Sequence, residues 1–293
     1  MILSQIELFK PEQMPSNDMK LIAPTSAPTN GNTTVSRSTF YQGDCLVEMD
    51  KIADKSVDMI LCDLPYGTTA CKWDSVIPFV PLWKQYERII KDNCAIVLLS
   101  QEPFTSYLLI SNVKKYRHKR IWVKDKCPNF LQAANQPKRL HEDILVFSVG
   151  TFGYQSKNKC TYNPIMNKRD LEKNPTNDNK LMSERMAEKV GTKNIRTKFK
   201  SDEKYNGNFT YPSDINYFPI DINNLYHPTQ KPVSLMEYLI KTYTNEGETV
   251  LDNCMGSGTT GVACRNTNRH FIGIEKDEKY FNIAVSRVSA YCG

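Results

Sequence analysis

The chain has 293 residues, of which 40% are hydrophobic and 24% charged, and its formal net charge is +6 at pH 7. This composition is typical of a globular chain that buries a core, and it excludes disordered and fibrous classes. No apolar run approaches the roughly 18 residues of a membrane span, and residues 1–10 lack the features of a secretory signal. The nine cysteines show no C-x-x-C pair and no zinc-ligand spacing. We therefore expect a cytoplasmic protein with reduced cysteines, no membrane segment and no metal.

The N-terminal region changes character near residue 39. Residues 11–38 are rich in Pro, Ser, Thr and Asn, so we expect residues 1–38 to form a flexible tail. Residues 40–45 are typical of a strand end and turn, and apolar residues at helical spacing follow them. Asp44 stands at this turn. It can accept a hydrogen bond from a ligand or cap the helix behind it, and the pattern leaves both open.

The most informative stretch is Asp63-Leu64-Pro65-Tyr66. It follows an apolar run over 57–62 that is typical of a buried strand, and Pro65 ends that strand. Ligands bind at such strand ends in open α/β sheets. Asp63 and a backbone carbonyl can accept the two hydrogens of an exocyclic amine while Tyr66 stacks on the ring. A strand end without function is the simpler alternative.

The next elements follow in regular order. The apolar pattern predicts a helix over 79–91, a strand over 94–99 and a helix over 103–110. Residues 114–126 carry seven basic side chains against one acid, which indicates either a solvated face or a phosphate-contacting edge. A short strand at 121–123 lies within this run. A further strand is expected over 144–149.

The middle of the chain is predicted to be an insertion over 151–225. Residues 151–220 hold 13 basic and 8 acidic side chains, few apolar runs, and interleaved aromatic residues. A basic segment with aromatic side chains is typical of a region that reads nucleic acid. A long lysine-rich surface excursion is the alternative.

The C-terminal part contains a glycine loop between two strands. A two-proline turn at 227–232 leads into a helix, and strands are predicted at 249–252 and 271–275, with a closing helix over 280–288. Gly256-x-Gly258-x-x-Gly261 fits the dinucleotide fingerprint, and Glu275 stands about 20 residues further on to accept from ribose hydroxyls. A nicotinamide-dependent oxidoreductase is therefore one hypothesis.

Two features favour a different nucleoside cofactor. The loop lies so near the C-terminus that the rest of the sheet must come from earlier in the chain. In addition, the 63–66 stretch has no obvious role in hydride transfer. A circularly permuted sheet that binds another nucleoside-bearing cofactor explains both.

These motifs carry a resemblance. The sequence resembles the β-class of S-adenosylmethionine-dependent DNA amino-methyltransferases, because Asp63-Leu64-Pro65-Tyr66 is followed later in the chain by Gly256-Ser257-Gly258-Thr259. Within this class the sequence is most similar to phage-like or restriction-associated adenine-N6 enzymes. Residues 227–232 look like the segment ahead of the family's cofactor strand, and His141-Glu142 also matches. The chain departs from the family at Leu64, where Pro is usual, and at Asn253-Cys254, where Pro-Phe is usual.

The resemblance implies an α/β fold with a circularly permuted, Rossmann-like methyltransferase sheet. Its catalytic half would span 39–150, the target recognition insertion 151–225 and the cofactor-binding half 226–293. The expected activity is methyl transfer from S-adenosylmethionine to the N6 amine of an adenine flipped out of double-stranded DNA. The protein would be a monomer or homodimer, with a possible cognate restriction nuclease as partner.

The resemblance also implies the site residues. The catalytic set is Asp63, Leu64, Pro65 and Tyr66. Thr229 and Lys231 are expected at the cofactor's carboxylate. The full cofactor set is Asp44, Cys45, Asp63, Thr229, Lys231, Asp252, Gly256, Ser257, Gly258, Thr259 and Glu275. Cytosine-N4 methylation presents the same amine geometry, but family members that act on cytosine more often carry Ser in place of Asp63. A DNA-binding protein with an idle site is the alternative from another class.

Overall fold

A computed structural model describes residues 36–68, 74–127, 133–153, 156–168, 209–221 and 225–290. The predicted N-terminal tail, apart from its last three residues, and much of the predicted insertion lie outside these ranges.

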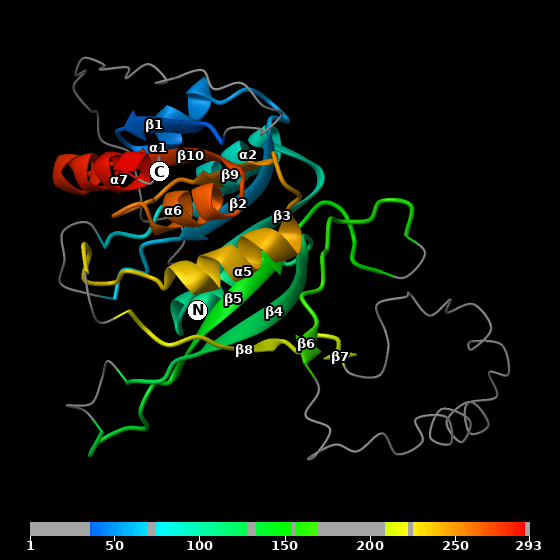
Figure 1. Ribbon diagram of the computed structural model, residues 1–293, viewed down its shortest axis with the longest axis vertical. Coiled ribbons are helices and arrows are strands. Elements are labelled where there is room, and N and C mark those ends of the chain that lie inside the picture. Colours follow the sequence, from blue (N-terminus) through cyan, green and yellow to red (C-terminus); the bar gives the residue numbers. More distant parts are fainter. Residues whose placement is uncertain are drawn as a thin grey trace, which may run out of the picture.

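The core of the fold is one mixed sheet of eight strands in the order β1-β10-β9-β2-β3-β5-β4-β8 (Figure 1). The strands from β1 to β3 in this order run parallel, β5 is antiparallel to its neighbours, and β8 is parallel to β4. The strands span β1 Ser38–Gln42, β2 Val57–Asp63, β3 Ile90–Ser100, β4 Tyr116–Val123, β5 His141–Phe147, β8 Ile215–Tyr217, β9 Thr249–Asp252 and β10 His270–Glu275. A separate pair joins β6 Asn167–Lys168 to β7 Phe209–Thr210.

The strand order confirms the predicted permutation. β9 and β10, from the end of the chain, lie between β1 and β2, from its beginning. Met59 and Ile60 of β2 pair with Val250 and Leu251 of β9. The carboxyl ends of the two predicted motif strands therefore meet in the middle of the sheet.

Helices cover both faces of the sheet because its strands alternate apolar side chains between them. Ile60 and Cys62 point toward α1 Cys45–Glu48, the 3-10 turn η2 Met49–Lys51, α2 Phe79–Ile89 and α3 Phe104–Ser111. Met59 and Leu61 point toward α5 Val233–Tyr243, α6 Thr259–Asn266 and α7 Glu278–Ala290. Burial on both faces explains why the central strands read as continuous apolar runs.

The predicted elements are all present, with shifted ends. The helix expected over 79–91 ends at Ile89, and the next two residues already belong to β3. The strand expected at 121–123 begins earlier, at Tyr116. β8 was not predicted: three residues from the predicted insertion pair with β4 and extend the sheet.

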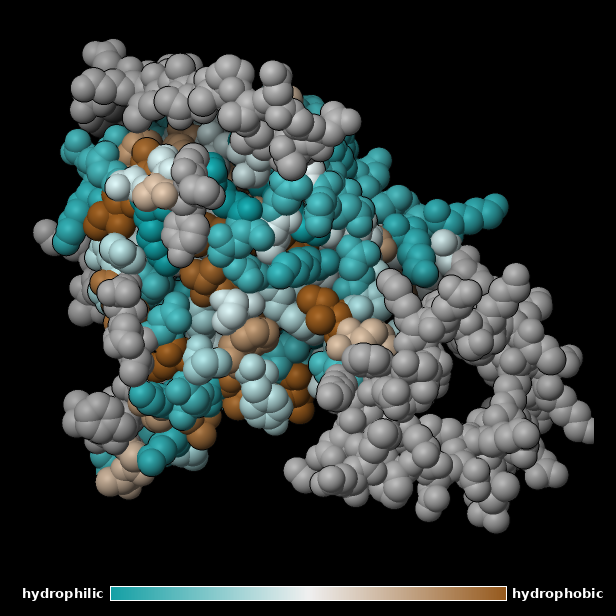
Figure 2. All heavy atoms as spheres, viewed as in Figure 1, coloured by the Kyte–Doolittle hydropathy of each residue, from teal (hydrophilic) through white to brown (hydrophobic). Residues whose placement is uncertain are grey.

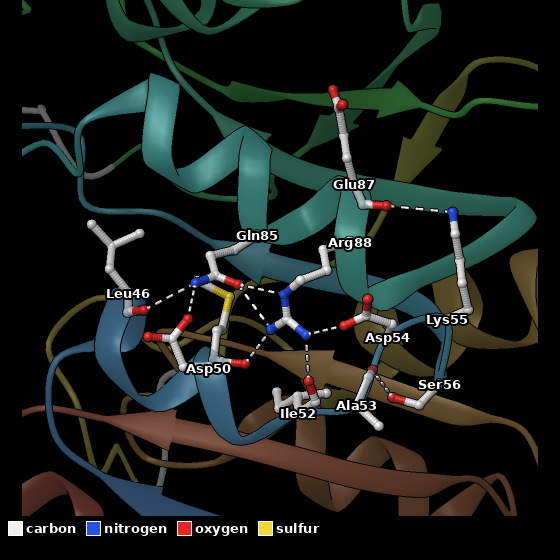
Figure 3. A network of polar contacts seen from close by, with 11 residues as sticks. Leu46, Asp50, Ile52, Ala53, Asp54, Lys55, Ser56, Gln85, Glu87 and Arg88 are labelled. Carbon is white, nitrogen blue, oxygen red and sulfur yellow. Dashed lines mark hydrogen bonds and ion pairs between the residues drawn. The ribbon is translucent and has the colours of Figure 1, made fainter.

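Arg88 fixes the turn between α1 and β2 onto α2 (Figure 3). Its guanidinium donates to the backbone oxygens of Met49 and Ile52, both at 2.7 Å, and to Asp54 Oδ1 at 2.5 Å. Gln85, one turn earlier on α2, accepts from the same guanidinium at 2.9 Å. The bonds to two carbonyls satisfy the end of the short 3-10 turn.

The surface is mainly hydrophilic on the face drawn in Figure 2, with hydrophobic side chains scattered among polar ones. In the ranges that the structure describes, no helix is both long and apolar enough to span a membrane.

Candidate active site

Four acidic residues line the carboxyl edge of the sheet, one at the end of each of four adjacent parallel strands. In sheet order they are Asp44 after β1, Glu275 on β10, Asp252 on β9 and Asp63 on β2. All four were predicted from sequence as site residues. In an open α/β sheet this edge is where ligands bind.

Asp63 is held through both of its carboxylate oxygens. The Tyr66 hydroxyl donates to Oδ1 at 2.6 Å, and Lys231 Nζ lies 2.9 Å from Oδ2. The Asp63 side chain keeps 22% of its surface exposed. Tyr66 also stacks on Phe104, with ring centroids 5.2 Å apart. The predicted carboxylate and aromatic ring are therefore together, although Phe104 carried no sequence signal for a site.

Lys231 takes a place that sequence reasoning missed. Its Nζ bridges Asp63 and Glu142, which lies on β5, with 3.0 Å to Glu142 Oε2. The expectation from the family was a contact with the cofactor's carboxylate, which the structure does not test. The only earlier signal for Glu142 was the match of His141-Glu142 to the family. His141 itself is exposed.

The glycine motif after β9 has three glycines with different physical roles, two in the loop and the third, Gly261, on α6. Gly256 (φ +51°) and Gly258 (φ +81°) adopt left-handed backbone conformations that disfavour other residues. A Cβ on Gly258 would lie 3.0 Å from that of Ala284 on α7. A Cβ on Gly261 would lie 2.7 Å from the Phe271 ring. A Cβ on Gly256 would meet only His227, at 3.9 Å, so space remains beside this backbone.

Two of the acids shape this loop. Asp252 accepts from the Cys254 amide at 3.1 Å and from the Thr260 hydroxyl at 2.6 Å. Burial raises the pKa of Asp252 to about 6, although these two hydrogen bonds lower it. Glu275 accepts from the Gly256 amide at 2.9 Å and from the Asp277 amide at 2.8 Å. Burial also raises the pKa of Glu275.

Asp44 takes the capping role, one of the two roles that the sequence left open. It caps α1 by accepting from the Leu46 amide at 3.1 Å, and its other oxygen lies 3.2 Å from Lys276 Nζ. Cys45, next to it, is buried. A hydrogen bond with Cys254 and then burial raise the pKa of the Cys45 thiol, so it is protonated at neutral pH.

Asn253, where the family usually has Pro, has a defined partner. The Tyr86 hydroxyl on α2 donates to Asn253 Oδ1 at 2.6 Å, and Asn253 is buried. This departure from the family therefore replaces a proline with a buried polar contact across the sheet face.

The turn before α5 packs against the glycine loop. Ser257 Oγ donates to Gln230 Oε1 at 3.3 Å, and Arg287 Nη1 on α7 reaches the Ser257 and Thr259 hydroxyls, both at 3.2 Å. Thr229 Oγ1 lies 3.0 Å from His227 Nδ1. The predicted cofactor residues thus lie at strand ends or in loops, except for Cys45 and Thr259, which are the first residues of α1 and α6.

The basic run at 114–126 is not one open phosphate-contacting edge. Arg120 and Lys124 are buried, where they contact Asn216 and Glu142. Lys115 pairs with Glu87, Lys119 with Asp143, and Arg117 donates to the Gly150 carbonyl. Among the described residues, no group of three or more His, Cys, Asp or Glu side chains is placed to hold a metal ion.

A permuted mixed sheet, with a glycine loop after one central parallel strand and an Asp-x-Pro-Tyr turn after the other, is typical of α/β proteins that bind a nucleoside-bearing cofactor. The chain matches the N6/N4 DNA methylase family over residues 57–286. It belongs to this family, and the predicted resemblance to S-adenosylmethionine-dependent DNA amino-methyltransferases is confirmed.

Individual relatives agree with this assignment. The chain is 23% identical over 297 residues to the type II methyltransferase M.HindIII of Haemophilus influenzae, which covers 85% of this chain and 94% of the relative. The solved PvuII DNA methyltransferase, cytosine-N4-specific, has a TM-score of 0.58 at 14% identity and covers 87% of each chain. The M1.HpyAVI–SAM complex has a TM-score of 0.51 at 24% identity and covers 85% of this chain and 99% of that one. At these identities the two structures show the shared fold.

Proposed function

We propose that this chain transfers a methyl group from S-adenosylmethionine to the N6 amine of an adenine flipped out of double-stranded DNA. The observation that carries the proposal is the place of Asp63, a partly exposed carboxylate beside Tyr66 at the strand end adjoining the glycine loop. Asp rather than Ser at this position favours adenine. The family match leaves the oxidoreductase hypothesis without support.

The chain's residues fit a nucleoside-bearing cofactor. The open space beside Gly256 lets a ligand approach the backbone, and Glu275 and Asp44 supply acceptors at the two neighbouring strand ends. We assign the ribose contact to Glu275. When bound, S-adenosylmethionine supplies a methyl group on a positively charged sulfur, which is a strong electrophile.

The chain's own residues then prepare the amine. The lone pair of the adenine amine is delocalised into the ring, so acceptors on both N–H bonds favour a pyramidal and more nucleophilic nitrogen. We assign these acceptors to Asp63 and the Leu64 carbonyl. A carboxylate oxygen has two lone-pair sites, so Asp63 Oδ1 can accept the amine hydrogen while Tyr66 stays bonded. Positioning for in-line attack supplies most of the acceleration.

Base flipping sets an energetic requirement that aromatic stacking reduces. Extruding a base from the duplex costs a few kcal/mol. Stacking on an aromatic ring returns roughly 1–3 kcal/mol per base. We assign this contact to Tyr66, which Phe104 supports through the ring contact described above.

We assign DNA recognition to the insertion at 151–225. Its described borders form a cavity of about 410 Å³ with β4, and Tyr211 before β8 and Tyr217 at the end of β8 are exposed. Aromatic and basic groups together suit nucleic acid. The residues lining the cavity are His118, Arg120, Phe152, Lys159, Tyr162, Pro212, Ser213 and Asp214.

Cytosine-N4 methylation is the second candidate, because the PvuII enzyme that shares this fold is cytosine-N4-specific. The type II classification of the relative M.HindIII supports a role beside a cognate restriction nuclease.

The test is to incubate the purified chain with duplex DNA and labelled cofactor, and to digest the DNA to nucleosides. N6-methyladenine is expected, and N4-methylcytosine would select the second candidate. Asp63→Ala should abolish transfer while calorimetry still detects cofactor binding. Full activity in that variant would refute the role of Asp63.

A further inference from the structure

Four side chains of alternating charge form a series of ion pairs that ends at Asp63. Lys124 Nζ is 2.5 Å from Glu142 Oε1, and Lys231 bridges Glu142 and Asp63 as described above. The four residues come from the segment after β4, from β5, from the turn before α5, and from β2. No local sequence pattern joins them, so the fold alone assembles the series.

Burial distinguishes the end of this series from its interior. The side chains of Lys124, Glu142 and Lys231 are only 7–8% exposed, whereas that of Asp63 is 22% exposed. Apolar residues of similar volume often stabilise a protein as well as a buried ion pair does. Packing therefore does not require this series, and the carboxylate at its open end indicates a role in the site.

Two aromatic rings also confine the ammonium group of Lys231. Its Nζ lies 5.8 Å from the Tyr66 ring centroid and 6.0 Å from that of Trp122. Trp122 is 2% exposed, and its ring nitrogen donates to the Phe218 carbonyl at 2.8 Å. Ring faces attract cations. Lys231 Nζ thus contacts two carboxylates and lies near two aromatic rings.

We propose that Lys231 is a positioning residue that holds Asp63 Oδ2 and keeps this carboxylate ionised for the amine contact. Glu142 weakens the contact between Lys231 and Asp63, because it pairs with the same ammonium group. The inference rests on the proposed function, because it requires Asp63 to accept from the target amine. Without Lys231, burial and the charge of Glu142 would favour a protonated Asp63, which presents a hydroxyl in place of an acceptor.

The electrostatics of Asp63 agree with this geometry. Burial is the largest effect and leaves the pKa of Asp63 raised overall. Lys231 lowers this pKa, Glu142 raises it, and the Tyr66 hydroxyl lowers it. In addition to burial, the charge of Asp63 in turn raises the pKa values of Cys62 and Asp252, and Lys124, together with Lys231, lowers the pKa of Glu142.

The test compares pH–rate profiles for methyl transfer in the wild type, Lys231→Met, Lys231→Arg and Glu142→Gln. Lys231→Met should lower kcat about 10- to 100-fold at neutral pH, as loss of a supporting partner commonly does. Its activity should recover as the pH rises, because the acidic limb moves to higher pH. Lys231→Arg should restore most of the activity, since it keeps the charge.

Glu142→Gln should move the acidic limb to lower pH, because Asp63 loses a repelling negative charge and no longer shares Lys231 with a second carboxylate. The double variant Lys231→Met/Glu142→Gln should fall between the two. Lys91→Met is the matched control: it removes an ion pair with Asp58, 2.7 Å, at the opposite end of the sheet, and should leave the limb in place.

An acidic limb that stays at the wild-type pH in both Lys231→Met and Glu142→Gln would overturn the proposal. A raised KM for S-adenosylmethionine with an unmoved limb would also overturn it, and would place Lys231 at the cofactor instead. If Lys231→Met does not fold, the Glu142→Gln profile decides. An active Asp63→Ala variant would refute the role given to Asp63 in the proposed function. An inactive Asp63→Ala variant, together with unmoved acidic limbs in Lys231→Met and Glu142→Gln, would overturn only this inference.

Discussion

Alanine at Gly258 and at Gly256 should have different consequences, although both glycines share one loop and one backbone conformation. At Gly258, with φ +81°, the new Cβ would lie 3.0 Å from Ala284 Cβ and 3.1 Å from its Cα. The left-handed conformation costs about 1–2 kcal/mol, and crowding against a helix backbone adds about 1–3 kcal/mol. We expect Gly258→Ala to lower the free energy of unfolding by about 2–5 kcal/mol.

At Gly256 the same change meets no crowding, because the nearest atom, in the His227 ring, is 3.9 Å away. Only the conformational term of about 1–2 kcal/mol applies. The added methyl group would instead stand in the open space that we assign to the cofactor. We expect Gly256→Ala to weaken S-adenosylmethionine binding about tenfold or more, which is a loss of about 1.4 kcal/mol or more.

Denaturant unfolding measures the first quantity and isothermal titration calorimetry the second, at a temperature where both variants are folded. Gly258→Ala should be the less stable protein and Gly256→Ala the weaker binder. Equal stability in the two variants would show that the contact with Ala284 does not restrict the loop. Wild-type affinity in Gly256→Ala would place the cofactor away from this backbone.

Three further predictions address the acids and the turn that support the site. Glu275→Ala should weaken S-adenosylmethionine binding about 10- to 100-fold in calorimetry, as loss of a charged hydrogen bond does, and unchanged affinity would move the ribose contact elsewhere. Asp252 has a pKa of about 6 in the folded protein, against an ordinary value of 3.8, so the folded state binds a proton more tightly than the unfolded state does. The contribution of Asp252 to the free energy of unfolding therefore falls by up to about 3 kcal/mol as the pH rises from about 4 to about 6. Asp252→Asn should remove that slope in pH-dependent unfolding, and an identical slope would argue against the raised pKa. Arg88→Lys should lower the free energy of unfolding by about 1–2 kcal/mol, because one ammonium cannot replace the fork that reaches two carbonyls, and unaltered unfolding would mean that this contact is dispensable.

The sheet and its strand-end residues were predictable because both depend on local patterns. Continuous apolar runs mark strands buried on both faces, and Asp63 and Asp252 directly follow two of them. The permutation followed from the late position of the glycine loop. β8 was not predictable, because three residues are too few to show a period, and its burial pattern has a single inward residue, Asn216.

Charge partners were not predictable for a different reason. The run at 114–126 shows its basic residues plainly, but not that Arg120 and Lys124 turn inward. Lys231 presents the same difficulty, since its contacts with Asp63 and Glu142 join three segments distant in sequence. Ion pairs between distant segments depend on the packed fold, so they cannot be predicted from composition and spacing.

The permuted order makes the contacts between the two ends of the chain decisive for the site. The Gly43 amide donates to the Glu275 carbonyl at 3.0 Å, Tyr86 bonds Asn253, and Lys231 meets Asp63. Each contact joins a residue before position 151 to one after position 225. The proposed amine acceptor and the glycine loop therefore acquire their relative positions only when both ends complete one sheet. The buried Tyr86–Asn253 contact contributes to this arrangement, because it links the two ends directly.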